Sequence, residues 1–436
     1  MIHNSQVDAT ARDKELMRRR GQAMGPTYRL FYDQPLHLVR GKGVYLYDAE
    51  GKEYLDCYNN VASVGHCHPH VVEALTRQAS RLNTHTRYLH ENVVNYAERL
   101  GATLPGDLSV CMFVCTGTEA NDLAFRIART VSGNQGAIVT EESYHGNSMV
   151  VTELSTAEYP ASQRPDYLAA IEPPNPYRGS YRRGEPALGA KYASLAGTAI
   201  EQLADRGQRP AMFLADSIFD SNGPLTAPKG YFHRVYDQVR AAGGLCVADE
   251  VQSGLCRLGD NMWGFEDSGV IPDIVTLGKP IGDGHPLAAV VTTPKIAAKF
   301  AREFHYFNTF GGNPVSTAVG LAVLDVIEQE NILNNVKEVG AYLGERLKNL
   351  ATRQPLIGDV RGKGLFYGLE IVRDHETLEP GATEAKTISD NLRANGVLVS
   401  TTGPLHNIIK IRPPMVFSMA NADHLLEQLE QAMKLN

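Results

Sequence analysis

Short apolar runs alternate with helical patterns through the middle of the chain. The clearest runs, which predict β-strands, are residues 109–115, 211–215, 245–248 and 274–277. Between them apolar residues recur every three or four positions, as in 120–131, which predicts an amphipathic helix. This alternation is typical of an α/β fold with a mostly parallel sheet covered on both faces. Such a sheet binds its ligand at the carboxyl ends of its strands.

The two ends of the chain have different patterns. Near the N-terminus, strand-like residues 43–48 and 52–56 flank a turn that contains Gly51, which predicts a β-hairpin. Toward the C-terminus we expect both strands and helices. They are a strand at 364–371, a helix near 384–395, a short strand pair near Val397 and Ile408, and a closing helix.

This division predicts two domains. Residues 65–320 are expected to form a large α/β domain, and residues 1–64 together with 321–436 are expected to form a smaller α+β domain. Residues 155–190 are rich in Pro, Tyr, Arg and Gly, which predicts a long surface excursion from the large domain.

Composition narrows the class of protein. The 436 residues are 43% hydrophobic and 21% charged, which is enough apolar material for a sizeable core and excludes a disordered chain. With 49 acidic and 42 basic residues, the net charge of -7 gives no overall reason to bind nucleic acid. No run approaches the ~20 apolar residues of a membrane helix, and residues 1–20 lack the apolar core of a secretory signal. We therefore expect a cytoplasmic protein without nucleic-acid or membrane partners.

The first segment that indicates chemistry is residues 115–121, CTGTEAN, which follows an apolar run and opens a predicted helix. Backbone N–H groups at a helix N-terminus bind anions, Gly117 permits close approach, and the hydroxyl of Thr118 adds a donor. Phosphate would fit such a site. An ordinary strand-to-helix turn capped by a threonine explains the same residues.

Two further positions follow predicted strands. Asp249 comes directly after the run 245–248, and a buried carboxylate needs a cation or a proton nearby. Lys279 lies between a glycine and a proline after the next strand, and burial there would disfavour its charge, as in lysines that form imines. No His or Cys follows Asp249 at a convincing ligand spacing, so we expect no metal site.

A pyridoxal phosphate site requires a group that binds phosphate, an acid that pairs with the pyridine nitrogen and a lysine that forms an imine. Nearly the full length of the chain resembles the class III, fold-type I pyridoxal phosphate enzymes. The matching motifs are VGHCHP at 64–69, GTEAN at 117–121, YHG at 144–146, DEVQSG at 249–254, GKP at 278–280, TFGGNP at 309–314 and RGKG at 361–364.

The resemblance implies roles around the cofactor ring. Lys279 would form the imine with pyridoxal phosphate and then move protons at the substrate carbon, and Asp249 would pair with the pyridine nitrogen. Tyr144 would stack on the ring, His145 would be a further cofactor contact, and Gln252 would lie near the phenolic oxygen.

It also implies how the cofactor phosphate is held. Gly117 and Thr118 would bind it, helped by Thr309 from a second subunit, so the expected assembly is a homodimer or a dimer of dimers. Asp216 occupies the position of a family acid that contacts the ring region. The surrounding segment 216–223 departs from the commoner pattern.

Class III enzymes include transaminases, racemases and phospho-lyases, which all first remove a proton next to the imine. Reprotonation at the cofactor gives transamination, whereas phosphate on the neighbouring carbon allows β-elimination. The chain most resembles the ethanolamine-phosphate and phosphohydroxylysine phospho-lyase branch, through residues 59–69, 82–90, 306–316 and 410–415. The expected reaction converts O-phosphoethanolamine to acetaldehyde, ammonia and phosphate. The alternatives are a transaminase for an amine or ω-amino acid, and a non-catalytic interaction module.

A phospho-lyase needs a second anion pocket for the phosphate of its small-molecule amine substrate. Each basic candidate could equally be a surface charge or a structural ion pair, and Arg412 could instead bind a substrate carboxylate in a transaminase. The phospho-lyase branch has a basic residue at the position just before Asn407, and this chain has His406 there. The candidate pocket residues are Tyr28, Arg29, Arg87, His406, Lys410 and Arg412.

Overall fold

The computed structural model describes residues 10–434, and its centre is a seven-stranded sheet in the order β4-β10-β9-β8-β7-β5-β6. All neighbours are parallel except β10, which runs antiparallel to β4 and β9. The mostly parallel α/β sheet is therefore confirmed. The strands are β4 (Val110–Val114), β5 (Gly136–Thr140), β6 (Leu168–Ile171), β7 (Pro210–Asp216), β8 (Leu245–Asp249), β9 (Ile274–Leu277) and β10 (Ala288–Thr292).

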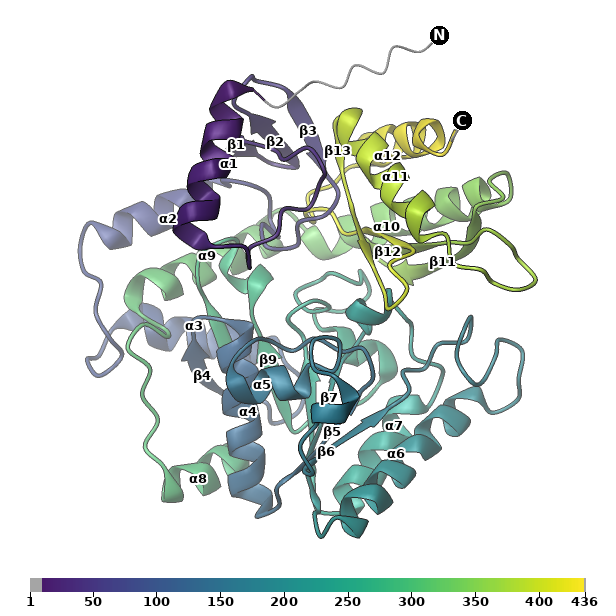
Figure 1. The fold of residues 1–436 in the computed structure, drawn as a ribbon. Helices are drawn as coiled ribbons and strands as arrows, with labels where there is room; N and C mark the ends of the chain where they lie inside the picture. The colour runs from purple at the N-terminus through teal and green to yellow at the C-terminus, as the bar shows by residue number, and fades with distance from the viewer. Residues whose placement is uncertain (1–9, 435–436) are drawn as a thin grey trace.

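Helices cover both faces of this sheet, which is why its strands are continuously apolar. Successive residues of β7 point to opposite faces: Met212 packs in the cluster around α4 (Gly117–Ser132), and Phe213 packs in the cluster around α6 (Leu188–Asp205) and α7 (Tyr231–Ala241). Figure 1 shows α4 on one side of the strands and α6 with α7 on the other.

Segments from both ends of the chain form two four-stranded sheets outside the large one (Figure 1). The first has the order β1-β2-β3-β13, in which β13 pairs in parallel with β3. The second has the order β11-β12-β15-β14. These strands are β1 (Leu38–Lys42), β2 (Tyr45–Asp48), β3 (Glu53–Asp56), β11 (Ile357–Lys363), β12 (Phe366–Ile371), β13 (Val397–Leu398), β14 (Ser400–Thr402) and β15 (Ile408–Ile411).

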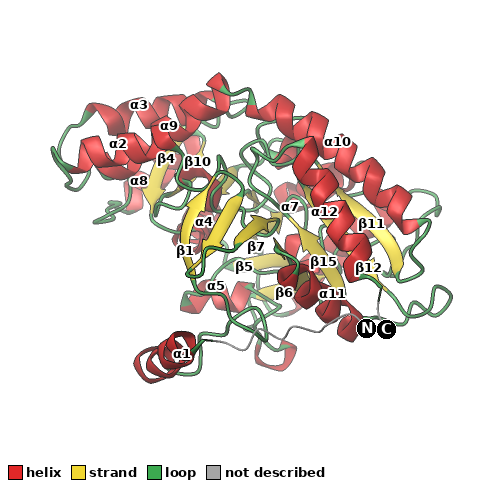
Figure 2. Ribbon diagram, turned by 90° about the horizontal axis from the view of Figure 1, so that it is seen from above, coloured by secondary structure: helices red, strands yellow, loops and turns green. Residues whose placement is uncertain are grey.

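Among the remaining helices, Figure 2 shows α2, α3 and α9 at one end of the molecule and α10, α11 and α12 at the other. Helix α9 packs against both α2 and α3, and most of its residues are buried. No helix in residues 10–434 combines the length and apolar character needed to cross a bilayer. The bounds are α1 (Ala11–Met24), α2 (Pro69–Ala79), α3 (Glu91–Ala102), α5 (Met149–Leu154), α8 (Pro294–Glu303), α9 (Pro314–Gln329), α10 (Ile332–Ala351), α11 (Ala382–Ala394) and α12 (Met419–Ala432).

Two local expectations need revision. Residues 155–190 are not only a surface excursion, because β6 lies within them and forms the edge of the large sheet beside β5. The strand near Val397 does not pair with the strand near Ile408; it joins β3, and Ile408 belongs to a strand between β12 and β14. Both pairings join segments distant in sequence, which local patterns do not predict.

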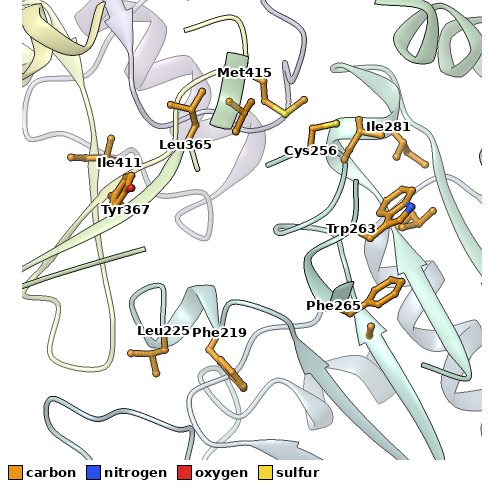
Figure 3. Close-up of a cluster of buried hydrophobic side chains, with 14 of the residues drawn as sticks. Phe219, Leu225, Cys256, Trp263, Phe265, Ile281, Leu365, Tyr367, Ile411 and Met415 are labelled. Atoms are coloured by element: carbon orange, nitrogen blue, oxygen red, sulfur yellow. The ribbon is translucent and has the colours of Figure 1, made fainter. Parts of the chain in front are cut away.

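One hydrophobic cluster connects the large sheet to the C-terminal strands. Phe219, Trp263 and Ile281 come from segments that follow strands of the large sheet, whereas Ile411 and Met415 come from the C-terminal part (Figure 3). All five side chains are buried. This packing fixes the ends of β7 and β9 relative to β15, where the polar groups described next lie.

Candidate active site

Three predicted residues lie at one edge of the large sheet. Asp216 and Asp249 end the neighbouring strands β7 and β8 and are in register with each other, and Lys279 follows β9. With residues 115–118 and Tyr144, they line a cavity of about 360 Å³. Small-molecule and cofactor sites span about 300–1,000 Å³. The strand ends therefore form a ligand-sized cavity where parallel sheets bind their ligands.

Asp249 is buried, with 4% of its surface exposed. Its Oδ2 accepts a hydrogen bond from Asn121 Nδ2 at 2.9 Å and lies 2.8 Å from Nδ1 of His145, and its Oδ1 accepts from the backbone N–H of Val251 at 3.1 Å. These contacts fix the orientation of the carboxylate. Within the described residues, the buried Nε2 of His145 has no hydrogen-bond partner.

Asn121 is a residue whose role sequence reasoning missed. Besides Asp249, its Nδ2 donates to the carbonyl of His145 at 2.8 Å, and its Oδ1 accepts from Thr276 Oγ1 at 2.7 Å. The side chain thus connects α4, β9 and the loop at His145 around one carboxylate. The signal was present in the sequence, because Asn121 is a polar residue within the buried face of α4.

Lys279 has a left-handed backbone with φ +32°. Non-glycine residues in this region are strained and concentrate at functional sites. Burial lowers the pKa of Lys279 to about 8, with Arg412 adding to the effect and Asp220 and Asp249 opposing it. A larger fraction of the amine is consequently unprotonated near neutral pH, which is the nucleophilic form.

The N-terminus of α4 satisfies both interpretations of residues 115–121. Thr116 is the N-cap, because its Oγ1 accepts from the N–H of Glu119 while Glu119 Oε2 accepts from the N–H of Thr116. Gly117 and Thr118 line the cavity, and their N–H groups, in the first turn, have no acceptor within the helix. A Cβ on Gly117 would lie 2.9 Å from Val251 Cγ2, so this close approach requires glycine.

Two buried cations lie next to the cavity. Lys410 and Arg412, at the end of β15, are 8% and 3% exposed, and both contact Asp220. Gln252, which lines the cavity, contacts Arg412: its Oε1 accepts from Arg412 Nη1 at 2.5 Å and from Asn60 Nδ2 at 2.6 Å. Burial lowers the pKa of Lys410, and Asp220 opposes that effect.

Asp216 lines the cavity and contacts the backbone of Asp220, which pairs with both cations. Its carboxylate accepts hydrogen bonds from the backbone N–H groups of Ile218 and Asp220, at 3.1 and 2.8 Å. Burial, together with the charges of Asp220 and Asp249, raises the pKa of Asp216 to about 8. Its carboxyl group is therefore mainly protonated at neutral pH.

Other predicted residues lie outside the lining of this cavity and are exposed. Arg87 stacks on Phe307, with 3.8 Å from its guanidinium carbon to the ring centroid. Thr309 borders a separate recess with Thr84 and His85. The predicted residues that are exposed and do not line the cavity are Tyr28, Arg29, Arg87, Thr309 and His406.

The residues present fit the pyridoxal phosphate that the sequence resemblance implies. The amides of Gly117 and Thr118 can hold a phosphate, Asp249 presents a buried carboxylate, and Lys279 supplies an amine of lowered pKa. The unpaired Nε2 of His145 is a buried polar atom that a ligand can satisfy. Residues 10–434 contain no group of three His, Cys, Asp or Glu arranged to hold a metal ion.

Comparison with known proteins shows the family of this chain. A solved phospholyase from Arthrobacter, in complex with phosphoethanolamine, is 43% identical with a TM-score of 0.93, covering 97% of this chain and 100% of that one. A Drosophila melanogaster protein named alanine–glyoxylate aminotransferase 2-like is 44% identical, covering 94% of this chain and 85% of the relative. A Caenorhabditis elegans protein named ethanolamine-phosphate phospho-lyase homolog 1 is 36% identical, covering 97% and 94%. The family model for class III aminotransferases matches residues 30–433. The chain therefore belongs to the class III aminotransferase family.

Proposed function

We propose that the protein is a pyridoxal phosphate-dependent phospho-lyase acting on O-phosphoethanolamine or a closely related phosphorylated amino alcohol or amino acid. The observation that carries this proposal is the buried pair Lys410 and Arg412, which shares a single carboxylate beside the cavity of Lys279. Two buried cations on one carboxylate leave positive charge for a substrate phosphate. The similarity to the Arthrobacter phospholyase supports the same substrate class.

Each group has a role in this proposal. Bound pyridoxal phosphate supplies an electron sink for the carbon next to the substrate nitrogen. Gly117 and Thr118 hold the cofactor phosphate, Tyr144 covers the ring, and Asp249 keeps the pyridine nitrogen protonated. Lys279 holds the cofactor and then accepts the proton from the carbon that bears nitrogen.

Elimination then breaks the bond between the neighbouring carbon and the phosphate oxygen. The phosphate leaves with the electron pair of that bond, and Lys410 and Arg412 stabilise its charge. The resulting enamine takes up one water molecule, so that O-phosphoethanolamine and water give acetaldehyde, ammonia and inorganic phosphate. No keto acid is consumed.

A transaminase is the second candidate, favoured by the name of the Drosophila melanogaster relative. In that function Arg412 would bind a substrate carboxylate. The two are separated by comparing kcat/KM for O-phosphoethanolamine with that for alanine plus a keto acid. We expect the phosphorylated amine to be preferred by at least about 100-fold, since a polar pocket built for one group discriminates strongly against ligands that lack it. The reverse preference would favour the transaminase.

We also propose that two copies complete each site. Thr309 is exposed and lies in a recess separate from Gly117 and Thr118, so it would reach the cofactor phosphate of a second copy. Large apolar side chains are exposed on nearby segments, including Leu89 at 100% and Phe310 at 70%. Contiguous exposed apolar surface marks interaction sites.

We also propose that the protein is cytoplasmic, although some relatives are named mitochondrial.

A further inference from the structure

The turn after β7 brings an acidic side chain to the two buried cations. Phe219 has a left-handed backbone, φ +49°, and a short 3-10 helix, Asp220–Asn222, follows it. The N–H of Asp220 donates to Asp216 Oδ2 at 2.8 Å. The carboxylate of Asp220 lies within ion-pair distance of β15 residues, and its side chain is 6% exposed. The chain therefore fixes a buried acid where the substrate phosphate is proposed to bind.

One carboxylate serves both cations. Lys410 Nζ lies 3.1 Å from Oδ1 and 3.4 Å from Oδ2 of Asp220, and Arg412 Nη1 lies 3.4 Å from Oδ2. Arg412 also donates from Nη1 to Gln252 and from Nε to the carbonyl of Tyr58. Within the described residues these contacts leave Nη2 of Arg412 for a ligand. The three charged residues together carry a net positive charge.

Asp220 is the charged acid of this group. Burial opposes its charge, yet Lys410, Arg412 and Lys279 hold the pKa of Asp220 below its usual value. The neighbouring Asp216 has a pKa raised to about 8 and is mainly neutral at pH 7. A phosphate that contacts Lys410 and Arg412 would therefore lie close to one like charge, that of Asp220. Repulsion between like charges is strong where water is excluded.

We propose that Asp220, through its charge beside Lys410 and Arg412, limits how tightly these two cations retain phosphate. The proposal rests on the proposed function, because phosphate is the anion that this pocket must both bind in the substrate and release as product. Without Asp220, two cations would face the anion with no opposing charge, and the product would leave slowly.

The test measures the affinity of the holoenzyme for inorganic phosphate, with the cofactor occupying its own phosphate site. In Asp220→Asn we expect the dissociation constant to fall at least about tenfold. The KM for O-phosphoethanolamine should fall in parallel while kcat does not rise. The reason is that an interaction which stabilises the bound substrate and the transition state equally does not accelerate the chemical step. Asp273→Asn is the matched control: Asp273 pairs with Arg240 at the opposite end of β9, and this variant should bind phosphate as the parent does.

Equal or weaker phosphate binding by a folded, cofactor-loaded Asp220→Asn would overturn the proposal. Should that variant not fold, Asp220→Glu retains the charge, and its phosphate dissociation constant is expected to stay within about threefold of the parent value; a larger change would also overturn the proposal. A parent enzyme that releases no phosphate from O-phosphoethanolamine contradicts the proposed function alone, because the affinity ratio of the two variants is measured without turnover.

Discussion

At the residue scale, the reactive candidate is Lys279, because burial lowers the pKa of its amine to about 8. The side chain is held on a left-handed backbone at the end of β9, and its surroundings disfavour the ammonium form. In Asp249 the orientation of the side chain is fixed instead, because its carboxylate contacts Asn121, His145 and the N–H of Val251. The two residues are thus presented to one cavity by separate sets of contacts.

Lys279→Ala should abolish turnover, because no other residue is proposed to hold the cofactor covalently or to accept the substrate proton. We expect kcat to fall at least about 10³-fold, the range of a lost acid–base group. The absorbance band of lysine-bound pyridoxal phosphate should also disappear while circular dichroism stays unchanged. Lys295→Ala, on the exposed face of α8, serves as the control. An unchanged spectrum in Lys279→Ala would refute the assignment.

The lowered pKa of Lys279 predicts a pH dependence for cofactor capture by the apoenzyme. The unprotonated amine reacts, and its fraction rises as pH increases through the pKa. The rate should therefore rise through about pH 8 and level off above it. An exposed lysine would still be gaining reactivity near pH 10. Stopped-flow absorbance measures the rate, and a midpoint near that of free lysine would show that burial does not tune this amine.

At the scale of elements, α4 contributes most through its first turn. The capping box uses the N–H of Glu119, whereas the N–H groups of Gly117 and Thr118, two residues that line the cavity, have no acceptor within the helix. Anion binding at such a turn combines free N–H groups with the positive end of the helix dipole. The position of the turn depends on the close packing of Gly117 against Val251.

Gly117→Ala should therefore weaken cofactor binding. The added Cβ would meet Val251 Cγ2 at 2.9 Å, and relieving such overpacking costs about 1–3 kcal/mol. We expect the dissociation constant of pyridoxal phosphate to rise by about tenfold or more, measured by fluorescence titration of the apoenzyme. Gly21→Ala is the control, because nothing lies within 4 Å of a Cβ at that position in α1. Equal affinity of both variants for pyridoxal phosphate would contradict the proposed role of Gly117 in binding the cofactor phosphate.

Elements with a strong local signal could be predicted from the sequence. The runs that became β7, β8 and β9, the hairpin of β2 and β3, and the start of α4 all follow from periodicity or from turn residues. The pairing of β13 with β3 and the edge position of β6 could not, because they depend on contacts between distant segments. The contacts of Asp220 with Lys410 and Arg412, and of Arg412 with Gln252, were missed for the same reason.

At the scale of the whole molecule, the placement of Thr309 is informative. It lies with Thr84 and His85 in a recess apart from the cavity, and the segments around it expose Leu89 and Phe310. A single chain therefore does not bring every predicted cofactor contact to one cavity. A second copy could supply the missing hydroxyl and cover the apolar side chains.

Light scattering on the holoenzyme should accordingly give at least twice the mass of one 436-residue chain. Thr309→Ala should lower cofactor affinity, because the lost hydroxyl would act in the neighbouring copy. The expected rise in dissociation constant is several-fold, the effect of one hydrogen bond to a charged group. A monomer with full activity would refute the shared site.

The central claim is elimination of phosphate, and one measurement tests it most directly. Purified holoenzyme is mixed with excess O-phosphoethanolamine and no keto acid, and inorganic phosphate, acetaldehyde and ammonia are followed together. We predict that the three products form in equal amounts over many turnovers, because elimination regenerates the cofactor. Product formation that stops after one turnover, or that requires a keto acid, would contradict the claim and identify a transaminase.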